Sequence, residues 1–94
     1  MAIEWRELAS DDLLAIVKYI AQDNPIAAEE VGAEILRQIE MLNTQPDLGR
    51  TSRVRGFKEL VITGLPYVAP YRIKGQDVEI MRVFHTAQNW KKLK

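Results

Sequence analysis

Apolar and polar residues alternate in three neighbouring runs in the second half of the chain. These runs cover residues 58–62, 67–73 and 78–85 and are rich in aromatic and β-branched side chains. Short stretches containing glycine, proline or aspartate separate them at 63–66 and 74–77. Alternation bounded by turn residues is typical of β-strands that are joined in sequence. The pattern therefore predicts a three-stranded antiparallel meander.

Alternation also predicts which side of this sheet is covered, because neighbouring strand residues point to opposite faces. The face expected to lie under helices carries Tyr71, Ile73, Ile80 and Phe84. The opposite, open face would then carry Arg72, Lys74 and His85. Two residues fit poorly, because Pro70 lacks the N–H that a ladder uses and Arg82 falls on the covered face. One of them is expected to need a bulge or a strand end.

The first half of the chain repeats its apolar residues at helical spacing in two stretches. Ser10 is the expected N-cap of the first helix, with Asp11 and Asp12 in its first turn. Asn24 caps the second helix and Pro25 begins it, and this helix is expected to reach about residue 42. The two apolar stripes are Leu13, Ile16, Val17 and Ile20, then Ala28, Val31, Ile35, Ile39 and Leu42.

The order of these elements predicts an α+β fold in a single domain over residues 1–94. A first strand is expected over 2–6 at a sheet edge, and a short turn or helix over 87–93. Because the helices follow one another and the strands follow one another, two antiparallel helices should cover one face of an antiparallel sheet. Gly32 costs the second helix ~1 kcal/mol relative to alanine, which a close approach of the two helices would explain.

Composition excludes several classes of protein. The 94 residues contain no cysteine and one histidine, so disulfides, thiolate metal sites and multi-histidine metal sites are excluded. The N-terminus has no signal-peptide pattern, and no apolar run approaches the ~18 residues of a membrane span. A cytoplasmic protein without a membrane partner is the expectation.

Charge is divided unevenly along the chain although the net charge is zero. Residues 1–47 hold ten acidic and three basic side chains, or −7, and residues 48–94 hold ten basic and three acidic ones, or +7. Two interpretations stay open. The halves neutralise each other within one fold, or a basic sheet surface attracts an acidic protein segment or a nucleic acid.

Candidate chemistry is confined to a group of cations that leads into and across the predicted strands. These are Arg50, Arg53, Arg55, Lys58, Arg72, Arg82 and His85. There is no Gly-rich phosphate loop, HExxH motif, nucleophile elbow or Cys/His pair. Cleavage of RNA would need a proton carrier such as His85, an arginine clamp, and a base such as Glu59 or Glu79. A lone histidine at a strand end is more often structural, and Tyr67 and Tyr71 fit a core better than a base-stacking platform.

Six stretches, collinear over almost the whole chain, form a recognisable set: DNPIAA at 23–28, PDLGR at 46–50, GFKEL at 56–60, YVAPYRI at 67–73, IMRVFH at 80–85 and QNW at 88–90. Together they resemble the RelE/ParE superfamily of type II toxin–antitoxin toxins. The resemblance implies a bacterial toxin that inhibits growth until a cognate antitoxin binds it in a hetero-oligomer.

The resemblance also implies a choice between two targets. RelE-like members cut mRNA in the ribosomal A site, while ParE-like members interfere with DNA gyrase and have lost the nuclease residues. RelE-like nucleases carry an arginine three residues before the tyrosine matched by Tyr71, and this chain has Val68 there. The patterns around Arg72, Arg82 and His85 favour the ParE-like branch. Ribosome-bound mRNA is the alternative target, and a non-toxic nucleic-acid-binding module is a further alternative.

The candidate site residues follow from these alternatives. If the chain is a nuclease, the resemblance implies a metal-independent mRNA endoribonuclease with His85 and Arg72 as catalytic residues. Contacts to the target or to a nucleic acid are expected from Arg53, Arg55, Lys58 and Arg82. No metal and no cofactor is implied.

Overall fold

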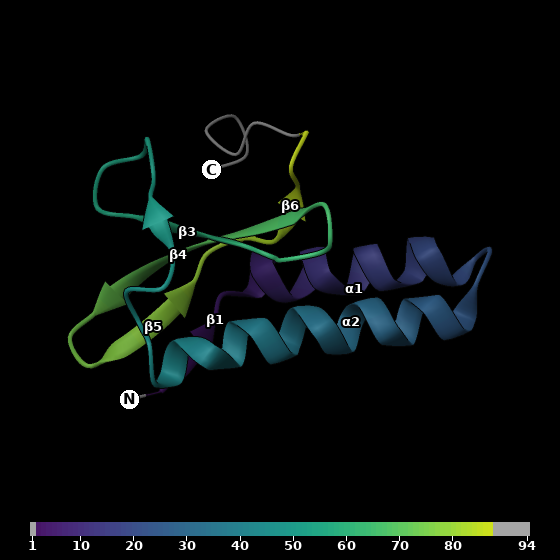
Figure 1. The fold of residues 1–94 in the computed structure, drawn as a ribbon, viewed down its shortest axis with the longest axis horizontal. Coiled ribbons are helices and arrows are strands. Elements are labelled where there is room, and N and C mark those ends of the chain that lie inside the picture. The colour runs from purple at the N-terminus through teal and green to yellow at the C-terminus, as the bar shows by residue number, and fades with distance from the viewer. Residues whose placement is uncertain (1, 88–94) are drawn as a thin grey trace.

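The computed structural model describes residues 2–87, which form a helical hairpin packed on a twisted sheet (Figure 1). Of the element expected at 87–93, all but Ala87 lies outside the described residues. The elements are β1 (Ile3–Trp5), α1 (Glu7–Ala21), α2 (Pro25–Glu40), the 3-10 helix η1 (Met41–Asn43), β2 (Arg50–Thr51), β3 (Lys58–Val61), β4 (Tyr67–Lys74), β5 (Asp77–Ile80) and β6 (Phe84–His85).

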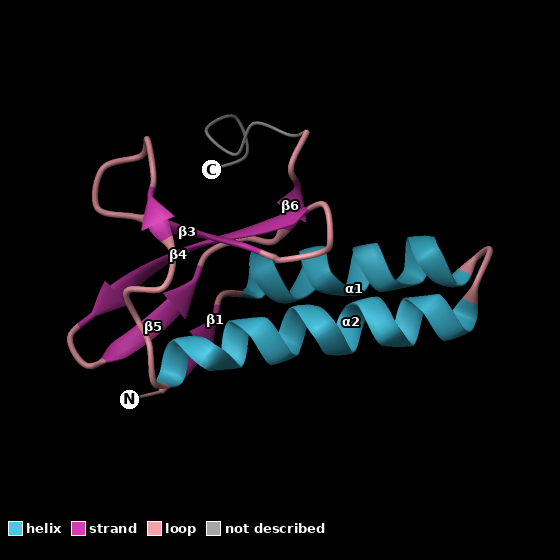
Figure 2. Cartoon of the chain, viewed as in Figure 1, coloured by secondary structure: helices cyan, strands magenta, loops and turns pink. Residues whose placement is uncertain are grey.

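Five strands form a mixed sheet in the order β1-β5-β4-β3-β2, and β6 pairs with β4 off this path. β3, β4 and β5 pair antiparallel in sequence order, so the predicted meander is confirmed. β1 lies at one edge, as predicted, and pairs parallel to β5. The α+β class is confirmed, and the two helices lie side by side with their connecting turn projecting beyond the sheet (Figures 1 and 2).

The start of α1 differs from its prediction, whereas the start of α2 agrees. α1 begins at Glu7, and Arg6 precedes it without a side-chain cap, so Ser10 is not the N-cap. The reason is that the Arg6 N–H still pairs with the Ile80 carbonyl at 3.0 Å, which places the turn from strand to helix directly after it. At α2 the Asn24 side chain accepts a hydrogen bond from the Ala27 N–H at 3.0 Å, as expected of an N-cap.

Gly32 marks a close contact between the two helices, as its mid-helix position predicts. A Cβ atom built on Gly32 would lie 3.1 Å from Cγ2 of Val17 in α1. That distance is tighter than an ordinary van der Waals contact, so a larger residue at 32 would force the Val17 side chain to shift by a few tenths of an ångström.

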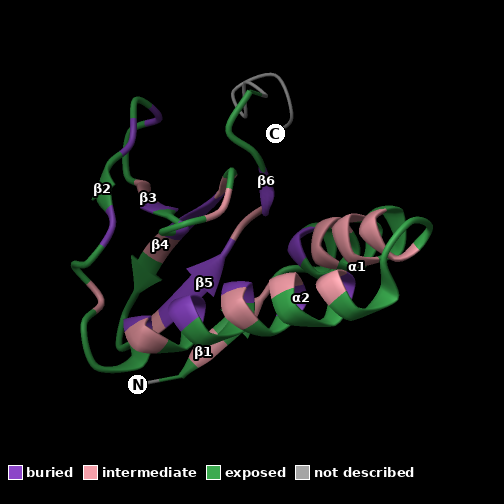
Figure 3. Cartoon of the chain, turned by 45° about the vertical axis from the view of Figure 1, so that its right-hand side comes forward, coloured by how far each residue is buried: buried purple, intermediate pink, exposed green. Residues whose placement is uncertain are grey.

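The hydrophobic core lies between the helices and the face of the sheet turned toward them, here called the inner face. Buried segments gather where the C-terminal half of α2 meets the sheet, and the tip of the hairpin is exposed (Figure 3). Fully buried core residues include Ile35, Ile39, Leu42, Tyr71, Val78 and Ile80. The opposite side of the sheet, here called the outer face, carries a smaller cluster made of Val54, Val68 and Phe84, with Phe57 packed against it.

A bulge divides the third predicted strand. Tyr71 pairs with Ile80 and Val68 pairs with Phe84, so the three residues 81–83 face only the two residues 69–70. Pro70 and Arg82 both lie in this bulge, which confirms the expectation of an irregularity there.

The same bulge moves Phe84 to the outer face, so its predicted place under the helices is wrong. One extra residue in a strand exchanges the faces of all residues that follow it. Val83 takes the core position instead. Ile73, near the end of β4, is 41% exposed rather than covered.

Candidate functional site

Arg72 belongs to an ion-pair cluster on the outer face of the sheet. Its Nε donates a hydrogen bond to Oε1 of Glu79 at 2.5 Å, and its guanidinium lies 5.9 Å from the centre of the Phe57 ring. Nη1 of Arg6 lies 3.6 Å from the other carboxylate oxygen of Glu79. Glu79 is 8% exposed, so its charge is compensated by two arginines and not by water.

His85 lies on the inner side of the sheet, so the predicted shared face of Arg72 and His85 is wrong. His85 pairs directly with Tyr67, and the two rings form an edge-on contact with centroids 5.8 Å apart. The Ala87 N–H donates to Nδ1 of His85 at 3.0 Å, so a neutral imidazole carries its proton on Nε2. His85, like Phe84, follows the bulge, so the extra residue places its side chain on the face opposite to the predicted one.

Arg82 is held by Asp12 across the junction between α1 and the bulge. Its Nε and Nη2 donate to the two carboxylate oxygens of Asp12 at 2.7 and 2.9 Å. Asp12 Oδ2 also accepts the Val83 N–H at 3.0 Å, a backbone group of the bulge. This bidentate contact raises the pKa of Arg82. The structure therefore gives Asp12 a tertiary role, where the sequence suggested a place in the first turn of a helix.

Arg53 and Arg55 extend from the loop between β2 and β3, and both are exposed. Val54, between them, is buried in the outer-face cluster and anchors the loop. The loop is closed by hydrogen bonds from the Ser52 N–H to the Phe57 carbonyl (3.1 Å) and from the Phe57 N–H to the Val54 carbonyl (3.2 Å). Alternation within this short loop thus packs Val54 against the sheet, while Arg53 and Arg55 extend into solvent.

Lys58 stands apart from these two arginines. It pairs with Tyr71 and therefore belongs to the inner side of the sheet, where its Nζ lies 4.0 Å from Oδ1 of Asp47. Of the four residues expected to contact a target, Arg53 and Arg55 lie together, while Lys58 and Arg82 lie elsewhere.

Tyr71 is buried, as expected, and its hydroxyl fastens the loop that precedes β2. The hydroxyl donates to the Pro46 carbonyl at 2.7 Å and accepts the Gly49 N–H at 2.8 Å. A Cβ atom on Gly49 would lie 2.5 Å from Cε1 of Tyr71, so glycine is required there. Burial raises the pKa of the Tyr71 phenol, the Gly49 N–H opposes that shift, and the charge of Asp47 adds to it.

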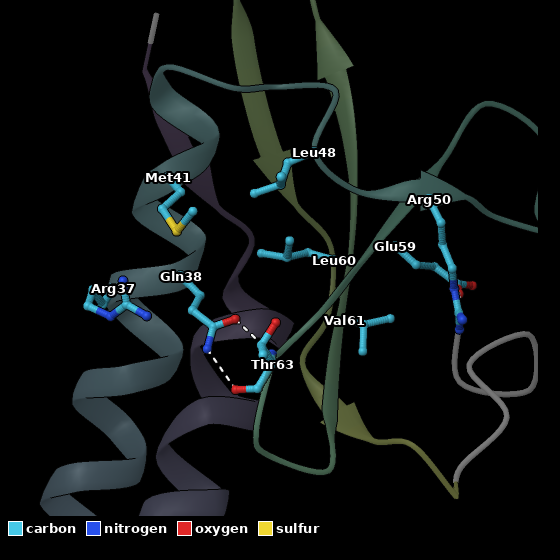
Figure 4. A pocket seen from close by; sticks show the side chains of 9 residues that line it. All are labelled: Arg37, Gln38, Met41, Leu48, Arg50, Glu59, Leu60, Val61 and Thr63. Carbon is cyan, nitrogen blue, oxygen red and sulfur yellow. Dashed lines mark hydrogen bonds and ion pairs between the residues drawn. The ribbon is translucent and has the colours of Figure 1, made fainter.

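A cleft of about 470 Å³ opens between the C-terminal end of α2 and β3 (Figure 4). Its lining residues are Arg37, Gln38, Met41, Leu48, Arg50, Glu59, Leu60, Val61 and Thr63.

Gln38 closes one end of this cleft. Its amide donates to the Thr63 carbonyl at 2.9 Å and accepts the Thr63 N–H at 2.8 Å, the two dashed contacts in Figure 4. Sequence reasoning missed Gln38, although a polar residue between Ile35 and Leu42 on the inward stripe of a helix is a signal for a buried hydrogen bond.

A family described as "ParE toxin of type II toxin-antitoxin system, parDE" matches residues 3–90. The chain belongs to this ParE toxin family. It is thus a toxin of the type II toxin–antitoxin class, as the collinear stretches predicted.

Individual members of this class are similar to this chain over nearly their whole length. "Putative toxin Y4kP" of Sinorhizobium fredii is 41% identical over 88 residues, which cover 94% of this chain and 91% of that protein. "Toxin RelE2" of Caulobacter vibrioides is 36% identical over 84 residues, which cover 89% of this chain and 91% of that protein. A solved structure titled "Chromosomal ParDE TA system from P. aeruginosa" superposes with a TM-score of 0.85 at 30% identity, covering 90% of this chain and 95% of the other.

Within this ParE-family chain, Val68 is the residue that bears most directly on chemistry. It occupies the position at which RelE-like nucleases were expected to carry an arginine. Its side chain is buried with Val54 and Phe84 in the outer-face cluster. In the described part of the chain, the outer face around Val68 is therefore filled with apolar atoms.

Two further properties concern the described part of the chain. Between residues 2 and 87, no group of three or more histidine, aspartate or glutamate side chains could hold a metal ion. No helix in the same residues is long and apolar enough to cross a membrane.

Proposed function

We propose that this toxin inhibits bacterial growth by acting on DNA gyrase, and that a cognate antitoxin protein neutralises it by binding. Membership of the ParE family supports the choice of target, and the similarity to a structure titled as a ParDE toxin–antitoxin system supports an antitoxin partner. A gyrase-directed toxin needs an exposed contact surface and no catalytic constellation.

The buried Val68 is the observation that carries the choice of gyrase over mRNA. Cleavage of a phosphodiester needs preorganised cations at the scissile phosphate, and loss of one donor typically lowers the rate ~10²–10³-fold. Arg72 and His85 cannot act as clamp and proton carrier on the same phosphate, because they point to opposite faces of the sheet. Two candidate catalytic groups on opposite faces cannot contact one phosphate together.

Arg53 and Arg55 are the contacts that we propose for the target. Both are exposed, and neither forms an ion pair with any residue that the structure describes. Their loop is fixed by Val54, so the two guanidiniums are presented from a defined place next to the sheet.

Induction of the chain in a bacterium, with two readouts followed together, tests the target. Gyrase-linked DNA breaks with SOS induction and intact mRNA are the expected result. Codon-positioned mRNA cuts on ribosomes that vanish in His85→Ala and Arg72→Ala would instead show a ribonuclease. Unimpaired growth with folded protein, together with salt-dependent binding to free nucleic acid, would favour the non-toxic binding module.

Charge reversal on the β2–β3 loop tests the contact surface. Arg53→Glu with Arg55→Glu should abolish growth inhibition while the chain stays folded, because both side chains are solvated. Lys18→Glu, at an exposed lysine of α1, is the control and should leave the toxin active. Full toxicity of the loop variant would show that Arg53 and Arg55 do not contact the target.

A further inference from the structure

Ser52 holds the base of the loop between β2 and β3. This residue is 8% exposed, and its hydroxyl donates to Oε2 of Glu59 at 3.1 Å and accepts the Val54 N–H at 3.0 Å. Its own N–H donates to the Phe57 carbonyl at 3.1 Å. These bonds fix the loop where it leaves the sheet, and the loop extends away from the helical hairpin (Figures 1 and 3).

The tip of the loop is a tight turn that carries two arginines. The Phe57 N–H donates to the Val54 carbonyl, which closes a β-turn, and Gly56 supplies the positive φ of 86° at the third position of that turn. Arg53 and Arg55 lie on either side of Val54 and are exposed. Neither side chain forms a hydrogen bond or an ion pair with any residue between 2 and 87, so both guanidinium groups can bind a ligand.

A cleft of about 300 Å³ lies beside this turn, where β4 extends past the start of β3. Its lining residues are Thr51, Gly56, Phe57, Lys58, Arg72 and Ile73. The lining holds two cations and no carboxylate, and Lys58 reaches it from the inner side of the sheet. Asp47, which lies 4.0 Å from Lys58, is 84% exposed and neutralises it little. Such a lining favours an anionic ligand.

Arg72 keeps donors for a ligand although it is paired with Glu79. Only its Nε forms a hydrogen bond to a residue that the structure describes, so both Nη groups stay available. Glu79 is shared with Arg6, and the three side chains together carry one positive charge. The Phe57 ring, whose centre lies 5.9 Å from the Arg72 guanidinium, supports that group on one side.

We propose that this cleft and turn bind the phosphodiester backbone of the DNA that gyrase holds. One phosphate enters the cleft between Lys58 and Arg72, and Arg53 and Arg55 bind phosphates that follow it along the DNA strand. The Thr51 hydroxyl, which also lines the cleft, donates to a phosphate oxygen. The inference rests on gyrase as the proposed target and adds which part of the gyrase–DNA complex this loop contacts.

The distribution of exposed apolar side chains favours DNA over an acidic protein segment at this loop. Protein contact surfaces are centred on apolar or aromatic side chains that anchor the partner. Among residues 2–87, five of the exposed large apolar side chains lie on the helices, namely Leu8, Leu14, Tyr19, Ile26 and Leu36. Of the same set only Ile73, 41% exposed, borders the cleft. A phosphodiester needs no apolar anchor, because it carries a charge at every nucleotide.

The affinity of the toxin for gyrase alone and for gyrase loaded with DNA provides the test. At ~50 mM salt the DNA should raise the affinity on the order of a hundredfold. Four neutralised phosphates give a slope of about −3.6 for the logarithm of this gain against the logarithm of the salt concentration. The gain should therefore be lost by ~200 mM salt.

Variants of the four cations show whether the gain comes from this site. Arg53→Gln with Arg55→Gln removes two of the four charges and should halve the slope, to about −1.8. Arg53→Lys with Arg55→Lys keeps both charges and should keep most of the slope. Lys58→Gln, in the cleft, should reduce the slope by about a quarter. Lys18→Gln, at an exposed residue of α1, is the matched control and should behave as the wild-type chain does.

The outcomes separate this inference from the proposed function. Equal affinity for gyrase with and without DNA would overturn the phosphate contact and leave gyrase as the target. A gain that both glutamine variants retain in full would overturn it too, because the DNA would then act through the conformation of gyrase.

Two further results concern the target and the ligand. If the toxin binds gyrase in neither form, the gyrase target is overturned. Salt-dependent binding to a free DNA duplex, weakened in the same variants, would then keep the phosphate site, and absence of that binding would overturn both. Displacement of the toxin from the duplex by poly-glutamate or RNA at lower concentration than by DNA would reassign the site to an acidic protein segment or to RNA.

Discussion

The two faces of the sheet are both largely buried, yet by different means. The inner face is buried under two helices by aliphatic side chains and one tyrosine. Among residues 2–87 no helix lies over the outer face, and beside its small apolar cluster this face holds the carboxylates of Glu59 and Glu79, which are 14% and 11% exposed and which arginines cover. The stability gained from burying apolar side chains grows with the area removed from water. A covered carboxylate, in contrast, is stable only while its arginine partners remain beside it. The inner face therefore holds the fold together, and the outer face presents charge.

The largest effect should come from the inner face. Ile39→Ala removes a fully buried side chain and should lower the free energy of unfolding by about 2–5 kcal/mol, because the cavity cannot fully collapse. Leu36→Ala, on the same helix but 42% exposed, is the control and should lower it by much less. Urea unfolding measures both, and equal losses at the two positions would contradict this assignment of the core.

A smaller effect is expected on the outer face. Glu79→Gln should lower the free energy of unfolding by about 1–3 kcal/mol, because Arg6 and Arg72 then surround a neutral group. The loss stays modest because both arginines are partly exposed and can be hydrated. Glu30→Gln, at an exposed residue of α2, should leave stability within about 0.5 kcal/mol. A variant Glu79→Gln as stable as wild type would mean that the cluster adds nothing.

The smallest effect concerns pH and the one hydroxyl of the inner core. The pKa of Tyr71 is raised in the folded chain, so above the ordinary value of ~10 the unfolded chain loses this proton first. Stability should then fall as pH rises past ~10 and should not depend on this group below that pH. Wild type should exceed Tyr71→Phe in unfolding free energy by a constant amount from pH 7 to 9, as thermal unfolding measures. That excess should shrink at higher pH. An excess that grows instead would mean that folding lowers the pKa of Tyr71 rather than raising it.

The candidate site was predicted in part, and the residues show why. Arg53 and Arg55 were correctly expected together on a pre-strand segment, because their order depends only on local alternation. Arg82 was expected at a target surface, but Asp12, 70 residues earlier in the chain, binds it. No local pattern links two positions that distant, so sequence reasoning could not assign that contact.

The sequence by itself determined the helical hairpin, the meander, the α+β class and the toxin family. Caps, turn residues and periodicity act between residues a few positions apart, so they can be read without a structure. The tertiary structure decided which face each residue after the bulge occupies, and it bound Arg82 to Asp12. Both depend on chain segments that meet only in the fold: the extra residue between Ile80 and Phe84 is accommodated opposite β4, and α1 brings Asp12 to the bulge.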